Sequence, residues 1–305
     1  MSGFKKPTVL AREANVKLRN KLGLAVPADP RRSFTDKMEF LSTGTLIGYK
    51  DHGAAYPTAN MKAAIVAGAK QAREIIRDAN DQVAAVIMLR RKESAVFQQI
   101  MDKHFGLIAG DDAGGYLKDN IVDKKFSLRA IKERDRRWVI EKVREKFLSL
   151  SFHLNTGVYL IDVDATNRDI RSGATANPAA ADPNEEAYVS YEKGDTDPAT
   201  WRTTNWKGMA TGALSGFKNG EIHISFEKLQ HYSALSYARV IIHEAAHKYL
   251  GVKDHAYAHE ATYPTLSLVQ CLDNADSIAW AATSLFCGAV KMGTAGVNPD
   301  WEQCT

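Results

Sequence analysis

Cysteine is scarce in this sequence: 305 residues contain three, Cys271, Cys287 and Cys304. So few cysteines exclude a small domain held together by disulfides, and an odd number allows at most one intramolecular disulfide. We place Cys271 and Cys287 on one continuous helix, where the ~24 Å between them is too far for a disulfide. The cysteine content therefore favours synthesis in a reducing cytoplasm.

Long hydrophobic runs are also lacking. The longest, Ala63–Ala69 and Val83–Leu89, fall well short of the ~20 residues that a membrane-spanning helix needs. Charged residues interrupt the sequence after Lys5 and Lys6, so we expect no cleaved secretory signal. We expect cytoplasmic synthesis without a signal peptide, and export by a signal-independent secretion system is the open alternative.

An excess of charge of one sign is lacking too. The 40 Lys and Arg residues nearly balance the 36 Asp and Glu residues, which leaves a net charge of +4. This value is too small to predict nucleic acid or an anionic membrane as the main partner. With 45% hydrophobic and 25% charged residues, the composition matches a globular protein and excludes disorder throughout the chain.

The pattern of residues divides the chain after residue 57. Residues 1–57 are polar and interrupted by proline, and they are predicted to form an N-terminal appendage of unknown role with a short helix over Thr8–Leu22. Residues 58–305 are predicted to form one α+β domain, mainly helical with a small sheet. Periodicity predicts helices over 58–89, 94–105, 132–150, 233–250 and 265–287, and strands over 157–164, 187–192 and 221–227. The irregular stretch 194–219 is predicted to be a substrate-facing loop.

One predicted helix carries a metal-binding motif, His243-Glu244-Ala245-Ala246-His247, between an N-cap at Ser233 and a left-handed Gly251. Histidines at i and i+4 lie one turn apart, ~6 Å between Cβ atoms, so both imidazoles can reach one ion. Glu244 is rotated by ~100° from His243 and is predicted to be the general base that polarises a metal-bound water. Apolar residues before the motif indicate a buried helix, where a metal offsets the cost of burying histidines. An amphipathic helix with histidines on its polar face is the alternative.

A catalytic zinc ion takes three protein ligands, so a third ligand must accompany the two histidines. The metzincin pattern needs Gly and His where this chain has Leu250 and Lys253, and no glutamate follows over 265–287 for a gluzincin site. The downstream candidates are Asp254, His255, His259, Glu260, Asp273 and Asp276. Asp254 is the best of them, because Gly251 lets the chain turn back towards the end of the helix.

Gly251, Asp254 and Tyr257 match a G-T-x-D-x-x-Y-G segment, in which Val252 and Ala258 replace the Thr and the second Gly. In these residues and the H-E-x-x-H motif, the chain resembles the aspzincin metalloendopeptidases, the deuterolysin and peptidyl-lysine metalloendopeptidase group. The resemblance extends over about 58–288 through DKHFG at 102–106 and Asn-Ala-Asp at 274–276. It implies a zincin-like catalytic domain over 58–305 with one Zn²⁺ per chain, Asp254 as third ligand and Tyr257 as the hydroxyl that stabilises the oxyanion.

The resemblance also assigns substrate binding to Asp276. In lysine-specific members this aspartate and a carboxylate one helical turn later receive the substrate lysine, whereas this chain has Ala279 at the second position. One carboxylate discriminates less than two, so the resemblance implies a relaxed cleavage preference, basic at most. The alternative is that Asp276 only caps or solvates its helix.

The predicted function is a zinc-dependent endopeptidase that hydrolyses peptide bonds of a protein or peptide substrate through a metal-activated water. Such a chain without a signal peptide is also a candidate secreted effector or toxin, with a secretion machine or an inhibitor as partner. Two other functions stay open: an amidase or peptidase that acts on cell-wall peptide cross-links, and a non-catalytic zinc-stabilised binding module. Glu244 and Tyr257 argue against the binding module, because a structural zinc site needs neither.

Overall fold

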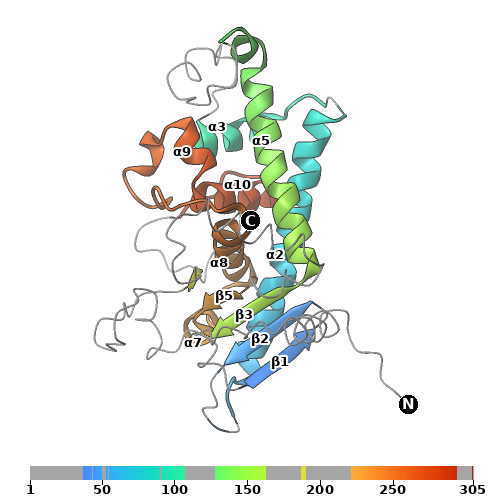
Figure 1. Cartoon of the computed structure of the whole chain (residues 1–305), viewed down its shortest axis with the longest axis vertical. Coiled ribbons are helices and arrows are strands. Elements are labelled where there is room, and N and C mark those ends of the chain that lie inside the picture. The colour runs from blue at the N-terminus through green and yellow to red at the C-terminus, as the bar shows by residue number, and fades with distance from the viewer. Residues whose placement is uncertain are drawn as a thin grey trace, which may run out of the picture. The chain divides into compact units, whose positions relative to one another are not determined.

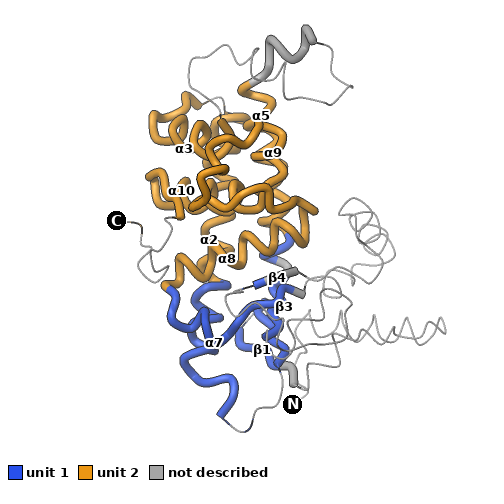
Figure 2. Tube along the Cα trace, turned by 90° about the vertical axis from the view of Figure 1, so that its left-hand side faces the viewer, with its two compact units in different colours: residues 1–69, 153–232 blue, residues 70–152, 233–305 orange. Residues whose placement is uncertain are grey.

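The computed structural model describes residues 37–42, 44–49, 53, 55–89, 91–106, 128–162, 187–189, 221–293 and 304. The chain divides into two compact units, residues 1–69 with 153–232 and residues 70–152 with 233–305 (Figure 2). The boundaries of the units fall within two long helices, α2 (Ala59–Ile87) and α5 (Leu128–Thr156). The helix predicted over Thr8–Leu22 and the loop predicted over 194–219 lie outside the described residues.

The first unit contains a five-stranded mixed sheet with the order β1-β2-β3-β5-β4 (Figure 1). The parallel pairs are β2 with β3 and β3 with β5, whereas β1 and β4 pair antiparallel at the two edges. Every residue of β2 and β3 is buried, as expected for parallel strands inside a sheet. The strands are β1 (Lys37–Ser42), β2 (Thr45–Tyr49), β3 (Val158–Asp162), β4 (Ala187–Val189) and β5 (Glu221–Ile224).

The sequence predicted three of these strands. The ranges 157–164, 187–192 and 221–227 contain β3, β4 and β5. The third strand ends early because Ser225 caps a short helix, α7 (Phe226–Leu229), by accepting a hydrogen bond from the backbone N–H of Lys228. β1 and β2 were not predicted, although they are no shorter than the predicted strands, because the polar stretch with several prolines around them indicated an appendage. They lie within residues 1–57, whose role as an appendage stays a prediction.

The second unit is helical, and α10 (Ala275–Cys287) packs against most of its other elements (Figure 1). Residues 275–285 of α10 are all buried, and the helix contacts α3, α8, α9 and η4. The sheet and the helices together make the chain an α+β protein, as predicted. In the described part of the chain, no helix is long and apolar enough to cross a membrane. The remaining elements are α3 (Ala95–Phe105), α8 (Ala234–Ala245), the π-helical turn η4 (Ala246–Leu250), the 3-10 turn η5 (Tyr263–Thr265) and α9 (Leu268–Leu272).

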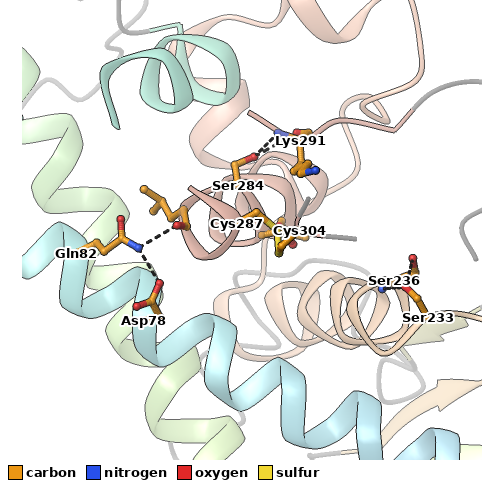
Figure 3. The surroundings of a disulfide bond; sticks show 11 residues. Asp78, Gln82, Ser233, Ser236, Ser284, Cys287, Lys291 and Cys304 are labelled. Atoms are coloured by element: carbon orange, nitrogen blue, oxygen red, sulfur yellow. Dashed lines mark hydrogen bonds between the residues drawn. A yellow bond between two sulfur atoms is a disulfide. The ribbon is translucent and has the colours of Figure 1, made fainter. Parts of the chain in front are cut away.

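The single helix predicted over 265–287 is wrong, because two helices occupy this range. α9 ends at Leu272, and Asn274 adopts an extended conformation, with φ −109° and ψ 121°, before α10 begins. Apolar residues continue on both sides of this break, so periodicity alone does not reveal it. Cys271 therefore lies on α9, as a buried free cysteine, and Cys287 lies at the end of α10. Cys287 forms a disulfide with Cys304, with 4.7 Å between the Cα atoms (Figure 3).

His104 connects α3 to α10 and η5. The side chain is fully buried, with Nδ1 2.9 Å from the Tyr263 hydroxyl and Nε2 3.1 Å from Ser284 Oγ. Ser284 also hydrogen-bonds the backbone N–H and carbonyl of Lys291 (Figure 3). Burial lowers the pKa of His104 to about 3, so the imidazole is neutral at pH 7.

We expect His104 to make the protein less stable in mild acid. An unfolded histidine binds a proton below its ordinary pKa of ~6.5, whereas folded His104 has a pKa of about 3. Only the unfolded chain therefore takes up a proton at His104 as the pH falls below ~6.5. This proton uptake lowers the free energy of unfolding by about 2 kcal/mol between pH 7 and pH 5. Urea unfolding should show this extra loss in the parent and not in His104→Gln, which does not titrate. Equal losses in both proteins would contradict the burial argument.

Candidate metal centre

The H-E-x-x-H motif lies where α8 passes into η4. Ser233 begins α8, and its Oγ accepts a hydrogen bond from the backbone N–H of Ser236 at 3.1 Å (Figure 3). Gly251 ends η4 with a φ of 64°, in the left-handed region that favours glycine. Both helix ends are as the sequence predicted. The sequence did not predict that the last turn, which includes His247, is π-helical, a geometry frequent at functional sites.

The side chains of His243, His247 and Asp254 converge. The Nε2 atoms of the two histidines lie 3.1 Å apart, and the Asp254 oxygens lie 3.2 Å from His243 Nε2 and 3.1 Å from His247 Nε2. Both histidines are buried, whereas the Asp254 side chain is 35% exposed, so the group is accessible from the side of Asp254. Among the described residues, these three form a group that could hold a metal ion.

Hydrogen bonds to the outer nitrogen of each imidazole orient the two histidines. His243 Nδ1 lies 3.1 Å from Asp276 Oδ1, and His247 Nδ1 lies 2.8 Å from the carbonyl oxygen of Val252. A carbonyl or an ionised carboxylate only accepts hydrogen bonds, so both rings donate from Nδ1. Their Nε2 atoms are therefore directed towards Asp254 and towards each other. Metal-binding histidines in proteins typically have such a partner behind the ring.

The group attracts positive charge. Burial alone lowers the pKa of His243, but hydrogen bonds with Asp254 and Asp276 outweigh burial and raise this pKa to about 10. His247 is also buried, and its hydrogen bond with Asp254 raises its pKa in the same way. Burial alone raises the pKa of Asp254, but the two histidines hold it well below its usual range. Two nitrogens and a carboxylate that face one another therefore favour a cation between them, whether protons or a metal ion.

Tyr257 and Glu244 lie beside the three converging side chains. Tyr257 is 40% exposed, and its hydroxyl lies 3.5 Å from Asp254 Oδ2. Its ring is stacked with those of His243 and His259, at centroid distances of 6.0 and 5.8 Å and an interplanar angle of 13° in each pair. Glu244 is buried, and its charge contributes to the raised pKa values of His243 and Tyr257. The structure thus brings the two predicted catalytic residues together with the three predicted ligands.

The other candidates for a third ligand have different partners. His255 Nε2 lies 3.1 Å from Asp273 Oδ2, and a Glu260 carboxylate oxygen accepts a hydrogen bond from the backbone N–H of Tyr257 at 3.1 Å. All six candidates lie within the described residues, and Asp254 is the one that supplies an atom to the group. Asp254 was predicted because Gly251 allows the chain to turn back towards the end of the helix. In the structure Gly251 is left-handed, and Asp254 lies beside both histidines.

Asp276 lies behind His243. It is 3% exposed, and its two carboxylate oxygens accept hydrogen bonds from His243 Nδ1 and from the backbone N–H of Ala258. Burial alone raises the pKa of Asp276, but the hydrogen bond with His243 outweighs burial and lowers it, so the carboxylate is ionised. Both oxygens are in use, which supports an orienting role more directly than contact with a substrate. The substrate-binding role of Asp276 stays a prediction.

Sequence reasoning missed two parts of the site. The Val252 carbonyl that orients His247 has no signature, because any residue supplies a backbone carbonyl. Asn274 contacts the loop that carries Asp254 and Tyr257, and the Asn-Ala-Asp segment was the available signal for it. An asparagine at the start of a helix is typically interpreted as a cap, so the sequence alone does not indicate that Asn274 contacts the loop.

A separate pocket of ≈520 Å³ lies between the end of α2, the start of α3 and α5. Val86, Ile87 and Ile140 supply apolar side chains to its lining, and Arg136 within it pairs with Glu93. None of the predicted site residues lines this pocket. The residues predicted to carry chemistry therefore lie around the group formed by His243, His247 and Asp254, and not around this pocket.

Comparisons with known proteins identify no relative. No protein-family model matches the chain, and neither curated proteins nor solved structures show a significant match. The function is therefore inferred from the residues and the geometry of His243, His247 and Asp254 and their neighbours.

Proposed function

We propose that the protein is a zinc-dependent endopeptidase in which His243, His247 and Asp254 bind one Zn²⁺. The observation that carries this proposal is the hydrogen bonding of the two histidines, whose Nδ1 atoms bind Asp276 and Val252 while their Nε2 atoms face Asp254. When a metal ion displaces the protons on the two Nε2 atoms, this arrangement directs three lone-pair donors at one position. The three ligands are those that the H-E-x-x-H spacing and the resemblance to aspzincins predict.

The spacing of the ligand atoms is compatible with a zinc ion between them. Zinc binds nitrogen and oxygen at ~2.0–2.2 Å in a tetrahedron, so neighbouring ligand atoms are ~3.3–3.6 Å apart. The separations of 3.1 and 3.2 Å in the protein are within a few tenths of an ångström of this range. Two imidazoles and one carboxylate form a donor set that catalytic zinc sites use, with a fourth position for water or substrate.

The neighbouring residues support catalysis rather than a structural role. A structural zinc site is usually closed by four protein ligands, whereas the group within the described residues has three. Glu244 adjoins the first ligand, and Tyr257 is exposed on the loop that supplies the third. A base and a hydroxyl donor beside an accessible metal group are the parts that peptide hydrolysis needs.

In the proposed mechanism, His243, His247 and Asp254 would hold a zinc ion, which would supply Lewis-acid chemistry for a water nucleophile and for the scissile carbonyl. Glu244 accepts the proton of the attacking water as the new C–O bond forms. Tyr257 donates a hydrogen bond to the oxyanion that develops on the carbonyl oxygen. Glu244 then delivers its proton to the nitrogen as the C–N bond breaks, which releases a carboxylic acid and an amine. Asp276 and Val252 keep the two histidines in their orientation throughout.

We expect Tyr257→Phe to lower kcat without changing zinc content. Burial and the nearby charge of Asp254 raise the pKa of Tyr257, so its hydroxyl is a donor at neutral pH. Phenylalanine keeps the ring that stacks with His243 and His259 and removes the hydroxyl. The loss should not exceed the ~10²–10³-fold that one oxyanion donor contributes. Steady-state kinetics together with zinc analysis test this, and a kcat equal to that of the parent would exclude the oxyanion role.

The proposed function is tested with a peptide library. The library is incubated with three preparations: the zinc-loaded chain, the chain after chelation and the chain reloaded with zinc. New peptide termini are then mapped by mass spectrometry. We expect internal cleavage that disappears on chelation and returns with zinc. Cleavage of isolated cell-wall cross-link peptides, with none in the library, would favour the amidase alternative. No cleavage of either substrate by fully zinc-loaded protein would reject the enzymatic proposal.

A further inference from the structure

Asn274 precedes α10 at the position where asparagine usually caps a helix. Its side chain makes no capping hydrogen bond to α10, although Asn274 is fully buried. A buried carboxamide is costly unless its oxygen and nitrogen have partners elsewhere. The partners of Asn274 therefore indicate a function other than capping.

The Asn274 carboxamide makes four hydrogen bonds, and three of them reach the loop between Gly251 and Ala258. Asn274 Oδ1 accepts hydrogen bonds from the backbone N–H groups of His255 and Ala256 at 2.8 and 3.3 Å. Asn274 Nδ2 donates to the carbonyl oxygen of Ala256 at 2.9 Å and to Ser277 Oγ at 3.0 Å. One side chain thus fixes three consecutive peptide groups of the loop, those between residues 254 and 257.

Backbone contacts extend this attachment on both sides. The N–H of Lys253 donates to the carbonyl of Asp273 at 2.8 Å, and the N–H of Ala275 donates to the carbonyl of Lys253 at 2.9 Å. At the other end, the N–H of Ala258 donates to the carboxylate of Asp276. The segment 273–276 therefore holds the loop through the backbone of residues 253, 255, 256 and 258. The two residues between these attachments, Asp254 and Tyr257, direct their side chains towards the histidines.

We propose that Asn274 is a positioning residue for the metal centre, which holds the ligand loop so that Asp254 is in place before the ion binds. This inference deepens the proposed function, because it rests on Asp254 as a metal ligand. A ligand on a loop that is already ordered loses less conformational freedom on binding than a ligand on a loop that must become ordered. Loss of the carboxamide should therefore weaken metal binding without removing any ligand.

The test replaces Asn274 by serine in the full chain. Serine caps helices about as well as asparagine does, but its side chain is too short to supply the carboxamide contacts with His255 and Ala256. Competition with a chelating dye measures the affinity for Zn²⁺ alone. We expect Asn274→Ser to bind zinc ~10–100-fold more weakly than the parent, the range typical for loss of a group that supports a metal ligand. Equal zinc affinity in folded Asn274→Ser and in the parent would overturn the proposal.

Ser267→Ala is the matched control. Ser267 caps α9 and forms a capping box with Gln270, and none of its hydrogen bonds reaches the ligand loop. Loss of this cap should lower the stability of the chain and leave zinc affinity unchanged. A fall in zinc affinity in Ser267→Ala as large as that in Asn274→Ser would attribute the effect to general destabilisation, and would overturn the positioning role.

Amide hydrogen exchange on the metal-free protein separates this inference from the zinc proposal. In the parent, the N–H groups of His255 and Ala256 should exchange slowly, because Asn274 Oδ1 accepts hydrogen bonds from both. In Asn274→Ser their exchange should be faster, while the N–H of Ile278 in α10 should keep its protection. Fast exchange at His255 and Ala256 in the parent would overturn the inference even if Asn274→Ser does not fold. A parent that binds no zinc but shows the slow exchange would reject the metal site and leave the loop attachment intact.

Discussion

Replacing Glu244 with glutamine is expected to lower turnover by ~10²-fold or more, because glutamine cannot accept the proton of the attacking water. Glutamine has nearly the same shape as glutamate, and the contacts of His243, His247 and Asp254 with one another do not involve Glu244. Zinc content and stability should therefore stay close to those of the parent. Cleavage kinetics and zinc analysis on the same preparation measure both quantities.

Glu145→Gln on α5 is the control for this loss of one negative charge. Glu145 is exposed and pairs with Lys142 at the surface. Its replacement should leave turnover unchanged. If Glu244→Gln cleaves every substrate as fast as the parent does, Glu244 is not the general base and the proposed mechanism is wrong.

Removing the third ligand should have the largest effect on metal binding. Asp254 contacts both histidines through separate carboxylate oxygens, so Asp254→Ala removes one of three donors and the negative charge that offsets the ion. We expect zinc affinity to fall by more than the ~10–100-fold that loss of a supporting hydrogen bond causes. Zinc content after dialysis against a weak chelator measures the effect.

Asp102→Ala controls for the loss of a carboxylate outside the site. Asp102 is exposed near the end of α3, and its backbone carbonyl, which accepts a hydrogen bond from the N–H of Gly106, is kept in the variant. This variant should retain its zinc. Full zinc occupancy in Asp254→Ala would reject Asp254 as a ligand and reopen the choice among His255, His259 and Glu260.

The parts of the site that follow local rules could be predicted from the sequence. Two histidines at i and i+4 share one helix face whatever the rest of the fold is, and a glycine after the helix allows the chain to return. These two rules indicated His243, His247 and Asp254, and the structure brings the three together. The α+β class followed in the same way from the alternation of helical and strand-like periods.

The parts that depend on contacts between distant segments could not be predicted. Asn274 and Asp276 support the site through the loop at 253–258 and through His243, and their sequence context is equally typical of an ordinary helix start. The break between α9 and α10 is set by the same contacts, because Asn274 is extended where it meets the loop. The short strands β1 and β2 are stabilised by pairing with each other and with β3, which periodicity does not report.

The central claim is that His243, His247 and Asp254 form one zinc site, and titration of the metal-free chain with zinc tests it most directly. Calorimetry gives the stoichiometry, and competition with a chelating dye gives the affinity. We predict one tightly bound Zn²⁺ per chain in the parent and the loss of this binding in His243→Ala, His247→Ala and Asp254→Ala. A folded parent without a tight site, or a site that persists unchanged in all three variants, would contradict the account.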